Sequence, residues 1–435
     1  MYGIFTPYIL YRTLVKGRSL GSWRQRFWER VLGHGPEVFG DRHCVWLHAV
    51  SVGEVNLLHP LVDELRQRYP DSDFVITTTT TTGLQLAKEK FPDLVCCYCP
   101  IDFSWAIHQR MRSWSPDLLF LSELEIWPNL IGIAKQKQIP IAVINGRLSE
   151  KSHRGYLKRK WLWRWFIRPS FESLTKVSVQ NAEDADRFVQ VGCHRSAVSI
   201  SGSIKFDGAM RSPDPSLLKQ LARQINLRDG QTLWVAGSTQ DPEEKIVSQV
   251  WQSLRADFPG LRLVIVPRHP HRGAEIRSRL VPSGIDVTLS SENQDSVDAD
   301  TILVADTIGQ LTGWWVLSSI AFVGGSFGDR GGQNMIEPAA AGSAVCFGPN
   351  TRNFKQVVRL MLARDVAEQV DSPEALQAFV RGCLQNPDQA AQRGRQARQL
   401  VEQSQGALTK TIEALDPLFA SESAVVTNSK HQSAA

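Results

Sequence analysis

Short polar motifs follow several of the apolar runs in this 435-residue chain, and some of their residues could do chemistry. The first motif, HAVSVGE (48–54), places the carboxylate of Glu54 just before a helical pattern. Glu54 could act as a general base, or it could only stabilise a helix N-terminus, whose dipole favours negative charge. Its position alone favours neither interpretation. Glu123 and Glu125 add two carboxylates after another apolar run, where Trp127 and a proline fix the turn.

Two other polar features of the first half could contact a ligand. Six consecutive threonines (77–82) begin as a strand pattern, and the outer ones offer hydroxyl groups to a polar ligand. Arg147 ends a later apolar run. It could hold an anion or simply neutralise the two carboxylates at 123 and 125, and the sequence favours these roles equally.

In the second half, the turn AGST (236–239) and the motif PRHP (267–270) end two further apolar runs. The turn is small enough for backbone N–H groups to approach a phosphate, and the second motif supplies the cation of Arg268. Five glycines within residues 324–332 then open a helix. Unpaired N–H donors and the helix dipole make such a loop an anion site, with a flexible surface loop as the alternative. Neither GxGxxG nor GxxxxGK(S/T) is present, which disfavours dinucleotides and P-loop nucleotides.

These motifs need elements to position them, and the chain supplies an alternation of strand and helix patterns. Eleven apolar or β-branched runs predict strands at 44–50, 74–79, 94–99, 117–122, 139–144, 176–180, 232–236, 261–266, 301–305, 320–324 and 344–347. The alternation favours parallel sheets covered on both faces. Eleven strands in one open sheet would be unusual, so we predict two doubly wound α/β domains, joined by the polar, proline-bearing linker at 202–215. Ligands of such sheets bind at the carboxyl ends of the strands, which predicts a site in a cleft between the domains.

Two segments carry most of the positive charge behind the net charge of +5. Residues 1–35 contain six Lys or Arg against one Glu, residues 147–168 contain eight against one Glu, and both are rich in aromatic residues. Tryptophan beside arginine and leucine is typical of helices that lie in a membrane interface. We therefore favour a membrane surface over nucleic acid as partner, with an ordinary core helix as the alternative for residues 1–15. No apolar run reaches the roughly 20 residues of a spanning helix.

The cysteines and acidic triplets give no sign of a metal site. Seven cysteines match no zinc or disulfide framework, which indicates a reducing compartment. Cys96, Cys97 and Cys99 lie in a strand pattern and are predicted to pack in the core, because cysteine behaves as a small hydrophobe. Three DxD triplets lie in polar connectors or helices rather than at strand ends.

Ten motifs in series carry a resemblance to a known family. They are HAVSVGE (48–54), TTTTTTG (77–83), SELEIWPN (122–129), INGRLS (144–149), SIKFD (203–207), AGST (236–239), PRHP (267–270), ADTIGQL (305–311), VGGSF (323–327) and GGQNMIEPAA (331–340). In this order they resemble the bacterial 3-deoxy-D-manno-octulosonic acid (Kdo) transferases. The resemblance implies a GT-B fold, with two Rossmann-like domains facing a cleft and an N-terminal membrane-associating segment.

The same resemblance implies an activity. Members of this family are inverting glycosyltransferases that move Kdo from CMP-Kdo to a lipid A precursor in lipopolysaccharide synthesis, at the cytoplasmic face of the inner membrane and without a cofactor or essential metal. An anionic lipid acceptor fits the basic, Trp-rich segments. Two alternatives are a sugar-nucleotide epimerase on the same scaffold and a membrane-bound homologue that has lost catalysis.

Individual roles follow from the matching motifs, with Glu54 as the implied general base. The residues implied to bind the donor are Ser238, Arg268, Gly309, Gly331, Gly332, Asn334 and Glu337. Those implied for the acceptor or a sugar carboxylate are Ser51, Gly53, Thr82, Glu125, Arg147 and Lys205. Gln310 and Gln333 depart from the family, which usually has Glu and His there. The domains expected are the membrane-associating segment (1–35), an acceptor domain (36–207), a CMP-sugar domain (208–420) and a disordered tail (421–435).

Overall fold

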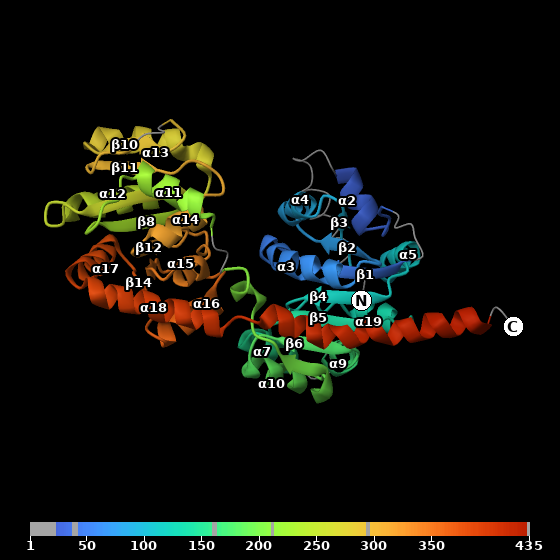
Figure 1. Cartoon of the computed structure of the whole chain (residues 1–435). Coiled ribbons are helices and arrows are strands. Elements are labelled where there is room, and N and C mark those ends of the chain that lie inside the picture. Colours follow the sequence, from blue (N-terminus) through green and yellow to red (C-terminus); the bar gives the residue numbers. More distant parts are fainter. Residues whose placement is uncertain (1–22, 37–41, 159–162, 210–212, 293–295, 433–435) are drawn as a thin grey trace. The chain divides into compact units, whose positions relative to one another are not determined.

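The computed structural model describes residues 23–36, 42–158, 163–209, 213–292 and 296–432. The chain divides into two compact units, one formed by Met1–Ile204 with Gln405–Ala435 and the other by Lys205–Ser404. Each unit is built on one seven-stranded sheet in which the paired strands run parallel (Figure 1). The prediction of two doubly wound α/β domains is therefore confirmed.

The first unit has the strand order β3-β2-β1-β4-β5-β6-β7. Its strands are β1 (His43–His48), β2 (Ser72–Thr78), β3 (Val95–Tyr98), β4 (Leu118–Ser122), β5 (Ile141–Gly146), β6 (Lys176–Val179) and β7 (Val198–Ile200). Its helices are α2 (Trp23–Arg30), α3 (Val52–Arg68), α4 (Thr81–Lys90), α5 (Ser104–Trp114), α6 (Pro128–Gln136), α7 (Glu150–Lys158), α9 (Arg168–Glu172), α10 (Ala182–Gln190) and α19 (Ala407–Gln432), with a π-turn at Trp163–Ile167. Because the chain leaves β1 in one direction and returns at β4 to build the other half, the topological switch point lies between β1 and β4.

The second unit repeats this plan with the order β10-β11-β9-β8-β12-β13-β14. Its strands are β8 (Thr232–Thr239), β9 (Leu261–Pro267), β10 (Asp286–Leu289), β11 (Thr301–Val304), β12 (Ile320–Val323), β13 (Ala344–Phe347) and β14 (Ala367–Gln369). Its helices are α11 (Pro215–Gln224), α12 (Glu243–Leu254), α13 (Gly273–Leu280), α14 (Leu311–Leu317), α15 (Ile336–Ala341), α16 (Lys355–Ala363), α17 (Pro373–Gln385) and α18 (Pro387–Gln403). Here the switch point lies between β8 and β12.

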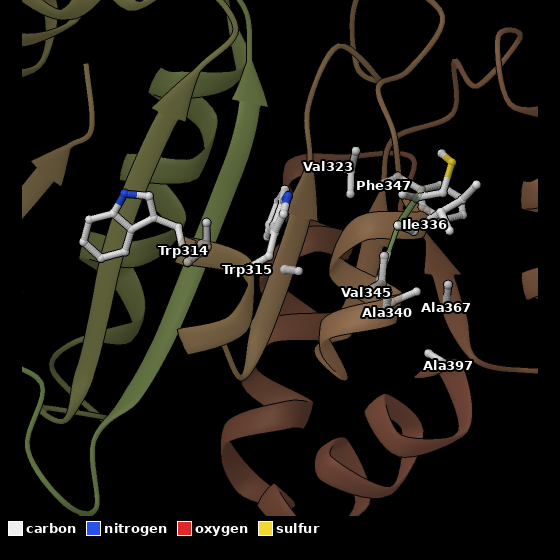
Figure 2. Packing of buried hydrophobic residues seen from close by; sticks show 14 of the residues in the cluster. Trp314, Trp315, Val323, Ile336, Ala340, Val345, Phe347, Ala367 and Ala397 are labelled. Atoms are coloured by element: carbon white, nitrogen blue, oxygen red, sulfur yellow. The ribbon is translucent and has the colours of Figure 1, made fainter. Parts of the chain in front are cut away.

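Apolar strands hold each sheet between its helices. In the second unit, side chains of α14, α15 and α18 pack with those of β12 and β13 (Figure 2). Trp315 lies so close to β8 that a Cβ on Gly237 would stand 2.3 Å from its ring. Glycine is therefore required at this position of the AGST motif (236–239), which the structure shows as the end of β8 rather than as a separate turn. All seven cysteines are buried and free, which confirms core packing for Cys96, Cys97 and Cys99.

The C-terminal boundary differs from the prediction that the second domain extends to residue 420. Helix α19 belongs to the first unit, where Ile412, Leu415 and Phe419 are buried with the apolar side chains of the first sheet. The ring of Phe419 stacks on Tyr69 of the α3 C-terminus, with centroids 3.8 Å apart. Apolar contact with α3 and the first sheet thus takes the last helix back to the first unit.

The predicted disordered tail at 421–435 overlaps the last part of α19, which continues to Gln432. No glycine or proline follows Pro417 to end the helix. Three strands were missed, β7, β10 and β14, and each is a short strand at the edge of its sheet.

The predicted membrane-associating segment (1–35) is described only from residue 23 on, and residues 1–22 lie outside the described part. Its described helix, α2, and the turn that follows it are held to the first unit by Arg110 of α5. This side chain is fully buried and donates to the carbonyls of Glu29, Gly33 and His34. Among the helices that the structure describes, none combines the length and apolar character needed to cross a membrane.

Candidate functional site

Glu54 lies at the switch point of the first unit, in the first turn of α3 directly after β1. Its Oε2 accepts the N–H of Val50 at 2.9 Å, and its Oε1 accepts the hydroxyl of Ser51, the N-cap residue, at 2.9 Å. The side chain is only 8% exposed. Glu54 therefore has the capping role that the sequence left open, since it satisfies polar groups at the start of α3.

The same carboxylate is also placed for proton transfer. Burial, followed by the charges of Glu125 and Glu123, raises the pKa of Glu54 to about 7, against the hydrogen bonds from Val50 and Ser51. A general base works best when its pKa lies near the operating pH. Capping and proton transfer are therefore compatible in Glu54. The capping hydrogen bonds hold the carboxylate in place, while burial and the neighbouring negative charges raise its pKa.

Glu123 and Glu125 follow β4, the neighbour of β1, so three acidic residues gather at this strand edge. Glu123 has a left-handed backbone (φ 53°), a conformation that costs about 1–3 kcal/mol in a non-glycine residue and is common in functional sites. Glu125 Oε2 accepts the indole N–H of Trp127 at 2.9 Å. Burial raises the pKa of Glu125, and the charge of Glu123 adds to the shift.

His48, the last residue of β1, belongs to this cluster and was not predicted. Its Nδ1 lies 3.2 Å from the carbonyl oxygen of Thr77, which can only accept, so we assign the proton to Nδ1. Its Nε2 is buried without a hydrogen-bond partner, 4.0 Å from Glu125 Oε2. Burial lowers the pKa of His48 to about 4, so the pair is not an ion pair at neutral pH. The signal in the sequence was its place at the head of HAVSVGE.

The other residues predicted on the acceptor side fall into different surroundings. Gly53 and Thr82 are exposed, whereas the hydroxyls of Thr78, Thr79 and Thr80 lie 3.1–3.3 Å from the carbonyl of Val50. These threonines therefore mainly hold the loop before Glu54 in place, through hydrogen bonds to the backbone of Val50.

Two predicted cations complete the acceptor list. Arg147 is half-buried. Burial raises the pKa of Asp184, and the charge of Arg147 opposes part of that shift. Its electrostatic partner is thus a carboxylate that the sequence did not single out. Lys205 opens the second unit, within the 3₁₀ turn Ile204–Phe206, and is half-buried.

In the second unit, Glu337 and Asn334 form a polar pair at the start of α15. Asn334 Nδ2 donates to Glu337 Oε1 at 2.9 Å, and its Oδ1 accepts the N–H of Ile336 at 3.1 Å. Burial raises the pKa of Glu337, while the Asn334 amide, the Trp315 indole and the charge of Arg268 oppose the shift. The charge of Arg268, which is exposed after β9, thus acts on the same carboxylate.

The glycine-rich loop differs from the open anion site that its sequence predicts. The N–H groups of Gly325, Ser326 and Phe327 all donate to the carboxylate of Glu243, at 2.7–2.9 Å. Further along, Gly332 donates to the carbonyl of Gly325 at 2.7 Å. These four donors are therefore engaged within the protein. Glu243 was missed because an acidic residue after a proline in a first helical turn is typical of ordinary dipole stabilisation.

The remaining predicted donor residues lie on the same edge of the second sheet or in its loops. Ser238, within β8, has a left-handed backbone (φ 55°), and Gly309 is exposed in the turn before α14 (φ 86°). Gly331 is buried against Arg352, where a Cβ would approach that side chain to 2.5 Å. Gln310 accepts the hydroxyl of Thr307 at 2.6 Å. No group of three or more His, Cys, Asp or Glu in the described part of the chain could hold a metal ion.

Solved structures of two other proteins share this fold. The UDP-GlcNAc 2-epimerase of Neisseria meningitidis bound to UDP-GlcNAc is 13% identical with a TM-score of 0.55, over 86% of this chain and 99% of that one. A glycosyltransferase of Rickettsia africae is 11% identical with a TM-score of 0.54, over 87% of this chain and 99% of that one. At these identities the likeness shows the fold alone, the GT-B arrangement of two Rossmann-like domains.

Comparison of sequences goes further. The family model described as 3-deoxy-D-manno-octulosonic-acid transferase matches residues 22–208. The 3-deoxy-D-manno-octulosonic acid transferase of Haemophilus influenzae is 30% identical over 397 residues, 91% of this chain and 92% of that protein. The Bordetella pertussis transferase of the same name is 30% identical over 385 residues, 86% of each protein. This chain therefore belongs to the 3-deoxy-D-manno-octulosonic acid transferase family of glycosyltransferases.

Proposed function

We propose that this enzyme transfers Kdo from CMP-Kdo to a hydroxyl group of a lipid A precursor, with inversion at the anomeric carbon. The observation that carries the proposal is the buried carboxylate of Glu54, with a pKa raised to about 7 at the switch point of the first sheet. Transfer of a sugar to an alcohol needs a base that withdraws the hydroxyl proton as the new bond forms. Glu54 supplies that base at neutral pH.

The proposed reaction is a single displacement. Glu54 takes the acceptor proton, the acceptor oxygen forms a bond to the anomeric carbon, and the bond from that carbon to the CMP phosphate oxygen breaks. The electron pair leaves with CMP, and the proton remains on Glu54 until solvent removes it. Inversion requires attack from the face opposite CMP, so the base must lie on the side of the sugar opposite the nucleotide.

On the donor side, the proposal assigns the ribose to Glu337, because a carboxylate accepts hydrogen bonds from hydroxyl groups. Arg268 is a cation beside the same carboxylate and suits the phosphate. Asn334 holds Glu337 in place through its amide. For the acceptor side, we assign Ser51, Gly53, Thr82 and Glu125 to the region around the hydroxyl, and Arg147 and Lys205 to anionic groups.

A transfer assay tests the proposal directly. Purified enzyme, CMP-Kdo and a lipid A precursor should give CMP and a product heavier by one or more Kdo residues in mass spectrometry. Release of CMP without an acceptor, and without a heavier lipid, would instead favour the epimerase-like alternative. Binding of CMP-Kdo with no turnover would favour an inactive homologue.

The raised pKa of Glu54 predicts a pH dependence. Only the ionised carboxylate can accept the proton, so we expect turnover to fall as the pH drops below about 7, by about tenfold per unit once well below the pKa. Because the charge of Glu125 helps to raise this pKa, Glu125→Gln should move the acidic limb of the profile to lower pH. Turnover that stays constant from about pH 5.5 to 8 in the wild-type enzyme would contradict the assignment of the base.

We further propose that the first unit docks on the cytoplasmic face of the inner membrane. Helix α7 buries none of its side chains, and large aromatic residues are exposed nearby in the sequence and elsewhere in the unit: Trp165 at 65%, Trp28 at 52% and Trp105 at 48%. Exposed tryptophans together with cations suit an anionic lipid interface. Arg159 and Lys160, two cations of the predicted patch, lie outside the described residues.

A triple variant tests this docking surface. Lys158→Gln with Arg164→Gln and Trp165→Ala should weaken binding to anionic vesicles by roughly thirtyfold or more, since each cation near the surface contributes about 1 kcal/mol. The loss should shrink at high salt. Arg398→Gln with Val281→Ala, exposed residues of the second unit, is the matched control. Unchanged partitioning of the triple variant in a vesicle sedimentation assay would refute the surface.

A further inference from the structure

One buried carboxylate ties together the two loops at the switch point of the second unit. Glu243 follows β8, and its Oε2 accepts the N–H groups of Gln240 at 2.9 Å and of Gly325 at 2.7 Å. Its Oε1 accepts those of Ser326 at 2.8 Å and Phe327 at 2.9 Å. The side chain is 1% exposed, and β8 and β12, whose loops it joins, are neighbours in the sheet.

The geometry fits an ionised carboxylate. Each oxygen of Glu243 already accepts two N–H donors, and none of these four contacts offers an acceptor for a carboxyl proton. Successive backbone N–H groups that converge in this way form a nest for an anion. Here the anion is a side chain of the protein itself. Burial raises the pKa of Glu243, against the four N–H donors.

The glycine-rich loop (324–332) packs closely around Glu243 and is held by further hydrogen bonds of its own. A Cβ on Gly324 would stand 2.8 Å from Glu243 Oε2 and 2.6 Å from the Thr239 backbone. The hydroxyl of Ser326 donates to the carbonyl of Val323 at 2.7 Å and accepts the N–H of Gly348 at 2.8 Å. The loop is therefore fixed from both sides.

What the loop positions is the pair proposed to bind the donor. Gly332 donates to the carbonyl of Gly325 at 2.7 Å, and Gln333 donates to the carbonyl of Gly324 at 3.1 Å. Asn334 is the next residue, and it holds Glu337. A chain of contacts thus runs from Glu243 through the loop to the carboxylate assigned to the ribose.

We propose that Glu243 is a positioning residue of the donor half-site, an internal anion that occupies the nest of the glycine-rich loop and thereby sets the geometry of Asn334 and Glu337. The inference rests on the proposed function, because it takes CMP as the nucleotide bound there. It also means that the donor phosphate does not use the N–H groups of Gly325, Ser326 and Phe327. That phosphate depends on side-chain cations such as Arg268.

Chemical rescue tests this role. Glu243→Ala removes the atoms of an acetate ion from the side chain, and acetate can restore the missing anion in the nest. We expect CMP to bind the variant at least about tenfold more weakly in calorimetry, as when a hydrogen-bonded charged group is lost. Added acetate should recover most of this loss, whereas chloride at the same ionic strength should not. Acetate should leave the wild-type affinity unchanged.

A second variant and a control distinguish loss of positioning from a general loss of folding in Glu243→Ala. Glu243→Gln keeps the shape of the side chain but places an amide NH₂ against N–H donors, so the donor KM should rise while the acceptor KM stays near the wild-type value. Glu244→Ala removes the adjacent carboxylate, which is also buried but pairs with Arg272, and acetate should not change the CMP affinity of this variant.

The outcomes separate the two proposals. Failure of the wild-type enzyme to bind CMP would overturn the proposed function. Wild-type binding with undiminished binding by both Glu243 variants would overturn the positioning role alone. Weakened binding that acetate does not restore would also overturn it, because the carboxylate would then matter only for stability.

Discussion

Glu54→Gln should reduce Kdo transfer by at least about a hundredfold while leaving the fold and CMP affinity intact. A positioned general base typically contributes about 10² to 10⁴ in rate, and glutamine cannot accept the proton. The amide oxygen of the variant can still accept one of the two capping hydrogen bonds, from Val50 or Ser51. The loss should therefore appear in turnover, measured under saturating donor and acceptor, rather than in donor binding.

Stability provides an independent check on the same variant. A carboxyl whose pKa is raised in the folded state destabilises the protein as the pH rises through that pKa, because folding then opposes ionisation. For Glu54, a shift from 4.5 to about 7 corresponds to about 3 kcal/mol above pH 7. At pH 8 the Gln variant should therefore unfold at a temperature no lower than that of the wild-type enzyme.

Two controls decide whether the effect belongs to Glu54. Glu64→Gln, an exposed position on the same helix, should leave transfer unchanged. Glu125→Gln should retain more activity than Glu54→Gln, because Glu125 is assigned to the surroundings of the acceptor and not to proton removal. Native transfer by Glu54→Gln together with loss in Glu125→Gln would move the role of base to Glu125.

Much of the fold could be predicted from the sequence because the central strands of both sheets are mainly apolar and buried, as in β4 (Leu118–Ser122) and β9 (Leu261–Pro267). The edge strand β14 could not, since Ala367–Gln369 is only three residues long and carries a charge. The pairing of α19 with the first unit was missed for a different reason. Its apolar positions, such as Ile412 and Leu415, indicate burial, but a sequence pattern does not reveal which sheet buries them.

In the candidate site, too, features that depend on neighbouring residues could be predicted, whereas contacts between residues far apart in the sequence could not. The position of Glu54 between strand and helix is local, so its two possible roles could both be named in advance. The anion in the glycine-rich loop is not local, because Glu243 lies 82 residues before Gly325. Glycine spacing predicts converging N–H groups, but it cannot tell whether a ligand or a carboxylate of the protein accepts them. His48 was missed likewise, since only the fold brings its Nε2 to Glu125.

The donor side yields the second prediction of large effect, Glu337→Gln. This change keeps the shape of the side chain and an oxygen that can accept from Asn334, which donates to Oε1 at 2.9 Å in the native protein. It removes the negative charge, and hydrogen bonds to a charged group contribute about 1.5–3 kcal/mol, so CMP should bind about ten- to a hundredfold more weakly in calorimetry.

The matched control for Glu337→Gln is Glu374→Gln, the same change at an exposed position in the first turn of α17. It should leave CMP affinity unchanged. Cytidine, which keeps the ribose but lacks the phosphate, should lose affinity in the Glu337 variant by a similar factor, because the lost contact is to the ribose. Arg268→Gln should instead weaken CMP and leave cytidine nearly unaffected. Equal CMP affinity in the wild-type enzyme and Glu337→Gln would mean that the ribose binds elsewhere, and the assignment of this carboxylate would be wrong.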